Sequence, residues 1–261
     1  MLIKDHLGRR LVLDLPAKRI ISLCPSITET LFTLGAGGNV VGRTRFCIHP
    51  EPDVKNALNV GGTKDVNMPR IASLQPDLIV AEKEENTKEI VETLERDYHV
   101  FVGDVKTVDD ALRLIQDLGR LTGLNDAAVG LVHTIKENLP VEEYRLTYRY
   151  AYMIWKNPEM AVGHDTYIDD LLSRFGFQNV FSKTIGRYPQ VSLHQLTELA
   201  PDVVFLASEP YPFSDGDRDF FANQLPGSQV LPIDGEIAWY GSRMVKALEV
   251  LKEVRMRLQS A

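Results

Sequence analysis

The sequence predicts an α/β protein of two lobes, each built on a parallel sheet, with a long helical stretch between them. In the first half, short apolar strand segments alternate with helical patterns, which implies a parallel sheet covered by helices on both faces. The second half repeats part of this pattern, and residues 108–139 between the halves have helical periodicity broken near Gly123. We expect lobes over 1–123 and 146–261, joined by a connecting helix over 124–145.

The elements of the first half follow from local signals. Alternation around Leu7-Gly8 predicts a β-hairpin, and the apolar run 19–23 predicts a buried strand. Ser26 followed by Glu29 has the spacing of a capping box at a helix start, and Gly35 is typical of a helix end. The same rules give further strands over 39–44, 78–81 and 100–104, and helices over 67–74 and 86–96.

A duplication is visible when 76–79 (PDLI) is aligned with 201–204 (PDVV). The same shift pairs Asn67 with Ser192, Leu74 with Leu199 and Glu84 with Glu209. Matching helix caps, apolar positions and strand starts indicate two lobes of the Rossmann-like type.

Composition excludes some functions. The formal net charge is -7 and no Lys/Arg run is present, which disfavours nucleic-acid binding because that needs a basic surface. No apolar stretch approaches the ~20 residues of a membrane-spanning helix. Met1 is followed by an alternating segment and not by a basic start and an apolar run, so we expect a cytoplasmic protein. The alternative is a periplasmic protein whose signal has been removed.

The loops that follow the predicted strands are rich in aromatic residues. Ligands bind beyond the carboxyl ends of strands in open parallel sheets, and two facing lobes would share a cleft there. The aromatic residues in these loops are Phe46, Trp155, Tyr188, Tyr211, Phe213, Trp239 and Tyr240. Any single one of them is more simply a structural plug, but together they indicate a surface for a large planar ligand.

Charged residues in the same loops could add polar contacts. Arg45 and Lys64 would favour an anionic group on the ligand. Glu84 lies where a strand should end at the cleft, and it could accept hydrogen bonds from ligand amides, although a charge run such as 82–85 is usually solvated surface.

The chain resembles a known family along nearly its whole length. The resemblance rests on DHLGRRLVLDLPAKRIISLCPSITETLFTLGAGGNVVGRT, VGGTKDVNMPRIASLQPDLIVA and YPQVSLHQLTELAPDVVFLA, together with RTRFCIHP, KEEN and WYGSR. It is similar to the ABC-transporter substrate-binding proteins that carry cobalamin, haem or ferric siderophores, the helical-backbone metal receptors, and especially to their cobalamin-binding branch.

The resemblance implies ligand contacts and a mode of binding. The positions that it carries over are Phe46, Lys64, Trp155, Tyr188, Trp239 and Tyr240. Such proteins hold cobalamin by shape and aromatic contact, so no protein ligand to the metal is assigned and no cofactor is required.

The resemblance also raises a question about the partner. Transport members have a glutamate on each lobe that pairs with permease arginines, in the first turn of a short helix. Here the two equivalent positions are Pro69 and His194. Docking to an ABC permease is therefore doubtful, although Glu198 or Asp65 could substitute.

Two cysteines leave alternatives open. Cys24 and Cys47 follow neighbouring predicted strands, so they could form a disulfide or remain two thiols. Cys47 with His49 could be a nucleophile and a base, but no third orienting group is evident. We expect no catalytic residue and no enzyme activity.

The sequence thus favours a binding protein for a bulky metal chelate, most simply cobalamin or another corrinoid. One alternative is a periplasmic ferric-siderophore or haem receptor of an ABC importer. The alternative from another class is a tetrapyrrole- or metal-handling enzyme, which rests on fold analogy alone.

Overall fold

The computed structural model describes residues 1–140, 147–184 and 186–259, and its contacts divide the chain into two compact units. The first unit comprises Met1–Val105, Asp109–Glu137 and Trp239–Met244, and the second comprises Lys106–Val108, Asn138–Ala238 and Val245–Ala261. The predicted connecting helix over 124–145 extends into 141–146, which lies outside the described residues, and its connecting role stays a prediction.

The first unit is built on a five-stranded parallel sheet of order β5-β4-β3-β6-β7. The strands are β3 (Ile20–Ser22), β4 (Val40–Arg43), β5 (Leu58–Asn59), β6 (Leu78–Glu82) and β7 (Val100–Gly103). The hairpin β1 (Leu2–Lys4) and β2 (Arg10–Val12) precedes the sheet as predicted, and Gly8 at its turn has a φ of 80°.

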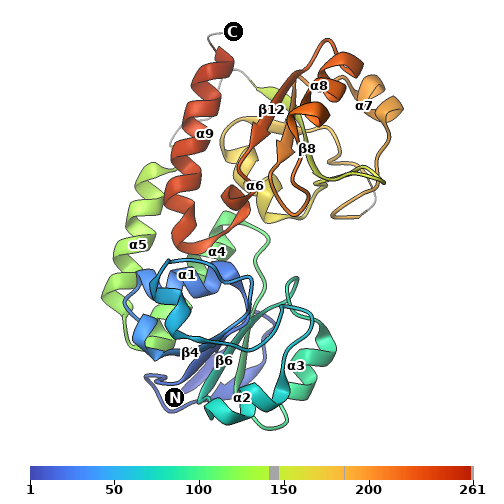
Figure 1. The fold of residues 1–261 in the computed structure, drawn as a ribbon. Coiled ribbons are helices and arrows are strands. Elements are labelled where there is room, and N and C mark those ends of the chain that lie inside the picture. The colour runs from blue at the N-terminus through green and yellow to red at the C-terminus, as the bar shows by residue number, and fades with distance from the viewer. Residues whose placement is uncertain (141–146, 185, 260–261) are drawn as a thin grey trace. The chain divides into compact units, whose positions relative to one another are not determined.

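Helices lie between the strands of the first unit and after its last strand. They are α1 (Pro25–Thr33), α2 (Met68–Leu74), α3 (Lys88–Leu94), α4 (Val108–Thr122) and α5 (Asn125–Asn138), with short 3-10 turns η1 (Gly37–Asn39) and η2 (Asp53–Asn56). Ile71 of α2 and Leu94 of α3 share one buried cluster with Ile21 and Ile79 of the sheet. These two helices therefore cover one face of the sheet, as Figure 1 shows beside β4 and β6.

The second unit repeats the arrangement on a sheet of order β10-β8-β11-β12, with β9 antiparallel to β8. Its strands are β8 (Tyr148–Trp155), β9 (Met160–Ala161), β10 (Phe177–Asn179), β11 (Val203–Ala207) and β12 (Gln229–Ile233). Its helices are α6 (Tyr167–Arg174), α7 (Leu193–Leu199), α8 (Asp215–Gln224) and α9 (Met244–Gln259), with the turns η3 (Gly235–Ala238) and η4 (Gly241–Arg243) near the end of the chain.

The helix caps confirm the local signals at three positions. Asn67 accepts a hydrogen bond from Arg70 N at the start of α2, and Ser192 forms a full capping box with Gln195 at the start of α7. Gly35 follows α1 with a φ of 95°. Each observation matches a residue type that satisfies free backbone groups or tolerates left-handed backbone.

The predicted capping box of α1 is wrong. The helix begins at Pro25, because proline suits the first helical turn, and Ser26 is a buried residue inside the helix. Glu29 does not return to the helix start, since its carboxylate pairs with Arg243.

An aspartate at the same place in both units accepts backbone hydrogen bonds from residues at or just before the start of the neighbouring strand. Asp77 accepts hydrogen bonds from Lys18 N at 2.8 Å and Arg19 N at 3.0 Å. Its repeat-mate Asp202 accepts one from Arg149 N at 2.7 Å. The preceding helix in each unit ends on a left-handed residue, Gln75 or Ala200. The duplication predicted from the sequence therefore extends to individual hydrogen bonds.

Replacing Asp77 or Asp202 with alanine removes hydrogen bonds to a charged acceptor that is exposed to water. We expect each change to lower the free energy of unfolding by about 1 kcal/mol, and Asp77→Ala to cost more because it loses two bonds. Urea denaturation measures this change.

The matched control is Asp14→Ala, which alters another exposed aspartate. An equal loss in Asp14→Ala and Asp77→Ala would contradict the stabilising role of the Asp77 hydrogen bonds.

Candidate functional site

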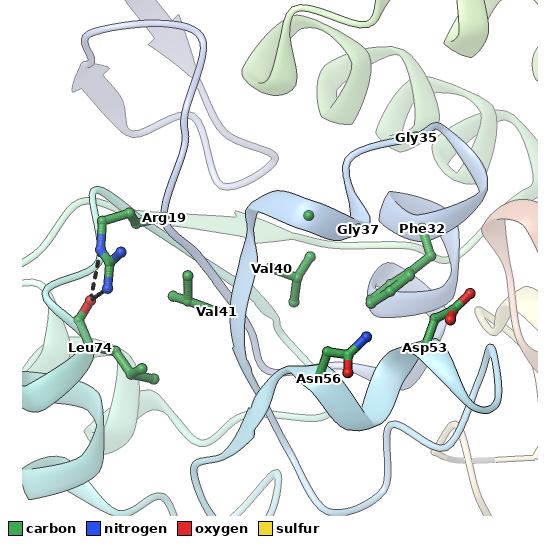
Figure 2. A pocket seen from close by; sticks show the side chains of 10 residues that line it. Arg19, Phe32, Gly35, Gly37, Val40, Val41, Asp53, Asn56 and Leu74 are labelled. Atoms are coloured by element: carbon green, nitrogen blue, oxygen red, sulfur yellow. Dashed lines mark hydrogen bonds between the residues drawn. The ribbon is translucent and has the colours of Figure 1, made fainter.

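One hollow formed by the described residues lies away from the predicted site. It has a volume of about 570 Å³ and is lined by Arg19, Phe32, Gly35, Gly37, Gly38, Val40, Val41, Asp53, Asn56 and Leu74. Arg19, Val40 and Asn56 stand at or just before the starts of β3, β4 and β5, so the hollow is at the amino ends of these strands (Figure 2). The guanidinium of Arg19 already donates to the carbonyl of Leu74. Ligands of parallel sheets bind at the opposite ends.

At the carboxyl ends of the first sheet, the turn that follows β6 is held from inside. The carboxylate Oε2 of Glu82 accepts hydrogen bonds from Glu84 N at 2.7 Å and Glu85 N at 3.1 Å. Asn86 accepts from Glu82 N through Oδ1, and its amide nitrogen donates to the carbonyls of Leu23 and Thr63. Glu82 and Asn86 are 2% and 3% exposed. One turn therefore fixes the loops that follow three strands.

This turn brings two predicted site residues together. The ammonium of Lys64 donates to the backbone carbonyl of Glu84 at 2.9 Å and so stabilises the turn. Lys64 is nevertheless exposed to solvent. The side chain of Glu84 is half-buried. The sequence did not single out Glu82 or Asn86, because an acidic run is usually solvated surface. The one sequence feature that could have indicated a buried Glu82 is its position at the end of an apolar strand.

Arg45 follows β4, and its guanidinium is already paired with a carboxylate. Its guanidinium forms two 3.0 Å hydrogen bonds to the carboxylate of Asp65 and lies 4.9 Å from the ring centroid of Phe46. The expectation that Arg45 attracts an anionic ligand group is therefore weakened. The ring of Phe46 is 49% exposed.

Trp239 and Tyr240 belong by their contacts to the first unit, although the sequence predicts them as part of the second lobe. Trp239 is half-buried, with the ring of His49 edge-on at 5.8 Å. Tyr240 is only 9% exposed, and its hydroxyl lies 3.3 Å from the Cys24 sulfur. Trp239 thus keeps ring surface for a ligand, whereas Tyr240 has little.

The second unit carries the remaining aromatic residues of the predicted site. Trp155 is the last residue of β8 and is 41% exposed, and its ring lies 5.7 Å from that of Tyr211 in an edge-to-face contact. Tyr211 in turn contacts the ring of Phe213 at 4.8 Å. Tyr188 lies in the loop after β10, is 37% exposed, and has the Arg187 guanidinium 5.8 Å from its ring centroid. The structure brings Trp155, Tyr211 and Phe213 into one aromatic cluster.

The surroundings of the two cysteines suit buried core residues and not nucleophiles. Cys24 and Cys47, both within the described residues, are free thiols and buried. Burial raises the pKa of each thiol, and the hydroxyls of Thr28 and Thr44 lie 3.1 Å from the Cys47 sulfur. A thiol with a raised pKa is a poor nucleophile at neutral pH. This argues against the pair of Cys47 and His49 as a nucleophile and base. Among the described residues, no group of three or more His, Cys, Asp or Glu is placed to hold a metal ion.

The ionisation of Glu82 should make the free energy of unfolding depend on pH. Burial raises the pKa of Glu82 to about 7 in the folded protein from an ordinary value of 4.5, and its Oε1 has no hydrogen-bond partner among the described residues. A raised folded pKa means that the folded state binds the proton more tightly. The stabilisation of the folded state by this proton is fully present below pH 4.5 and is lost as pH rises through 7.

We therefore expect the free energy of unfolding of the wild type, relative to Glu82→Gln, to fall by roughly 2 kcal/mol between pH 5 and pH 8. Urea denaturation at both pH values measures it. Glu84→Gln, which changes a half-buried neighbour, should show no such difference from the wild type. Parallel pH profiles for the wild type and Glu82→Gln would disprove the assignment.

Comparison with known proteins shows similarity to binding proteins. The family model described as "Periplasmic binding protein" matches residues 20–231. The Vitamin B12-binding protein of Vibrio campbellii is 28% identical over 219 residues, covering 81% of this chain and 78% of the relative. The Vitamin B12-binding protein of Vibrio cholerae is 26% identical over 197 residues, covering 73% of this chain and 70% of the relative.

Solved structures confirm the predicted fold. The periplasmic Vitamin B12 binding protein of Vibrio cholerae superposes with a TM-score of 0.75 at 22% identity, covering 94% of this chain and 97% of the other. The periplasmic haem-binding protein of the same organism gives a TM-score of 0.77 at 19% identity, covering 92% and 98%. Both comparisons support the two-lobed α/β architecture.

The comparisons also correct one expectation. A cytoplasmic location is wrong, because the matching family and the similar proteins are periplasmic binding proteins. No described helix is both long and apolar enough to cross a bilayer. With a family match that extends over most of its length and the resemblance confirmed, the chain belongs to the periplasmic binding protein family.

Proposed function

We propose that this protein binds a corrinoid, most simply cobalamin, through the loops at the carboxyl ends of its parallel strands. The observation that carries the proposal is the exposure of large aromatic rings at these ends in a chain of the periplasmic binding protein family. Phe46, Trp155 and Tyr188 are 49%, 41% and 37% exposed, so each of them has side-chain surface that a large ligand can cover.

The ring surfaces suit the ligand class. Flat aromatic faces gain most from contact with a large, rigid ligand that displaces water from them. In the first unit Phe46 and Trp239 supply such surface, and in the second unit Trp155 and Tyr188 do so. The relatives named as Vitamin B12-binding proteins support a corrinoid over other chelates.

Binding without turnover is part of the proposal. The buried thiol of Cys47 is not activated, and the corrinoid is a ligand and not a cofactor of a reaction. Glu84 and Lys64 would meet the amide groups at the edge of the ligand, where their polar atoms can exchange water for ligand hydrogen bonds.

An ABC permease is the partner that we propose for delivery of the ligand. Pro69 and His194 lie in the first turns of α2 and α7, and both are exposed. His194 pairs with Glu198 at 3.5 Å. A permease contact at these two helix starts would therefore involve a proline and a histidine, with Glu198 as the nearest carboxylate on α7.

Calorimetric titration of the purified protein with cyanocobalamin tests the proposal, with haemin and a ferric hydroxamate siderophore as comparison ligands. We expect saturable one-to-one binding of the corrinoid. Trp155→Ala and Trp239→Ala, one in each unit, should each weaken binding roughly tenfold or more, because each removes a large contact surface.

The matched control is Phe32→Ala, which removes an aromatic ring at the amino ends of the strands and should leave the affinity unchanged. Binding of another chelate but not of the corrinoid would replace the ligand and keep the site. Loss of binding in Phe32→Ala alone would move the site to the hollow of Figure 2.

A further inference from the structure

The segment Trp239–Arg243 is attached to helix α1 of the first unit at successive residues. The Tyr240 hydroxyl meets the sulfur of Cys24, which immediately precedes the helix. The backbone nitrogen of Ser242 donates to the hydroxyl oxygen of Thr30 at 3.0 Å. Arg243 pairs with Glu29 one residue earlier on the helix. The segment is thus held by three side chains that lie in α1 or directly before it.

Gly241 makes this close approach possible. Its φ is 82°, and a Cβ at this position would lie 2.0 Å from the Thr30 hydroxyl oxygen. A side chain would both strain the backbone and displace Thr30. The close contact between the segment and α1 therefore requires glycine at position 241.

The ion pair between Arg243 and Glu29 is the strongest of these contacts. Arg243 Nε donates to Glu29 Oε2 at 2.9 Å, and its NH2 group lies 2.9 Å from Oε1. The two side chains are 10% and 17% exposed. Two parallel hydrogen bonds fix the plane of the guanidinium, and low exposure protects the pair from water and salt.

The fixed guanidinium lies against Trp239. The guanidinium carbon of Arg243 is 5.5 Å from the ring centroid of Trp239, and the His49 ring contacts the same indole edge-on at 5.8 Å with an interplanar angle of 65°. Trp239 keeps an intermediate exposure despite both contacts. Its orientation is set from within the first unit, while part of its surface is still open to a ligand.

We propose that Glu29 and Arg243 are a positioning pair, which orients the ring of Trp239 as a ligand-binding surface. The proposal rests on the proposed function and deepens it, because neither residue needs to touch the ligand. Without the carboxylate, the guanidinium is no longer fixed in its plane and turns toward water. The indole then loses its cationic neighbour and samples more orientations, and ordering it again on binding costs affinity.

The first measurement follows the indole without any ligand. In a Trp155→Phe background, Trp239 is the only tryptophan, so its emission and its quenching by acrylamide report on this ring alone. We expect Glu29→Gln and Arg243→Lys to increase quenching and shift the emission toward longer wavelength. Glu29→Gln keeps the size of the side chain, and Arg243→Lys keeps the charge but loses the two parallel bonds.

The second measurement is the calorimetric affinity for cyanocobalamin with both tryptophans present. We expect Glu29→Gln and Arg243→Lys to weaken binding roughly five- to tenfold, as the loss of an oriented cation–aromatic contact implies. The double variant should be no worse than the single ones, because the two residues act as a unit. The matched control is Glu95→Gln, which breaks the pair of Glu95 with Arg9 in the same unit and should change neither measurement.

The outcomes separate the two proposals. A wild type that binds no corrinoid refutes the proposed function and the ligand role of Trp239 with it. A wild type that binds, with Trp239→Ala weakened but Glu29→Gln and Arg243→Lys unchanged in both measurements, overturns only the positioning pair. Retained folding of the variants is checked by circular dichroism, so that a loss of affinity is not a loss of structure.

Discussion

The side-chain amide of Asn86 holds together loops that follow different strands of the first sheet. At the carboxyl ends of parallel strands, backbone groups leave the hydrogen-bonded ladder and need other partners. An asparagine side chain has both a donor nitrogen and an acceptor oxygen, and here these serve Leu23, Thr63 and Glu82 at 2.9 to 3.2 Å. Lys64 follows directly after Thr63, so the buried side chain of Asn86 fixes the backbone next to the exposed ammonium of Lys64.

Glu82 completes the same constraint at an energetic cost. One carboxylate oxygen accepts two backbone hydrogen bonds, while the other is buried with no partner among the described residues. Burial removes water from the carboxylate and disfavours its charged form, which is the main physical cause of the raised pKa of Glu82. The polar turn of the candidate site is therefore held in place by hydrogen bonds to buried side chains, and this rigidity is consistent with the proposed binding of a large preformed ligand.

Local rules in the sequence were sufficient for most elements of the fold. Asn67 and Ser192 cap their helices because each interaction spans three residues, and the repeat placed β6 and β11 correctly. The same kind of rule failed at Ser26, where the neighbouring proline starts the helix and Glu29 serves a distant partner. A local pattern cannot reveal a partner that is 214 residues away, as Arg243 is from Glu29.

The candidate site was predictable in its residue types but not in its organisation. Aromatic residues after strands could be recognised from the sequence, and Trp155 and Tyr188 are exposed in the structure. Which of them is covered depends on tertiary contacts, so the burial of Tyr240 against Cys24 could not be inferred. The neutralisation of Arg45 by Asp65 likewise depends on how two loops meet, 20 residues apart in the chain.

Hydrogen exchange measured by mass spectrometry, with and without cyanocobalamin, tests most directly whether the carboxyl-end loops bind the ligand. The account predicts slower exchange in 45–50, 61–65, 82–86 and 239–243 on binding, with little change around 35–41 at the amino ends of the strands. Protection confined to 35–41 and the neighbouring Phe32, or no protection in the presence of saturating ligand, would contradict it.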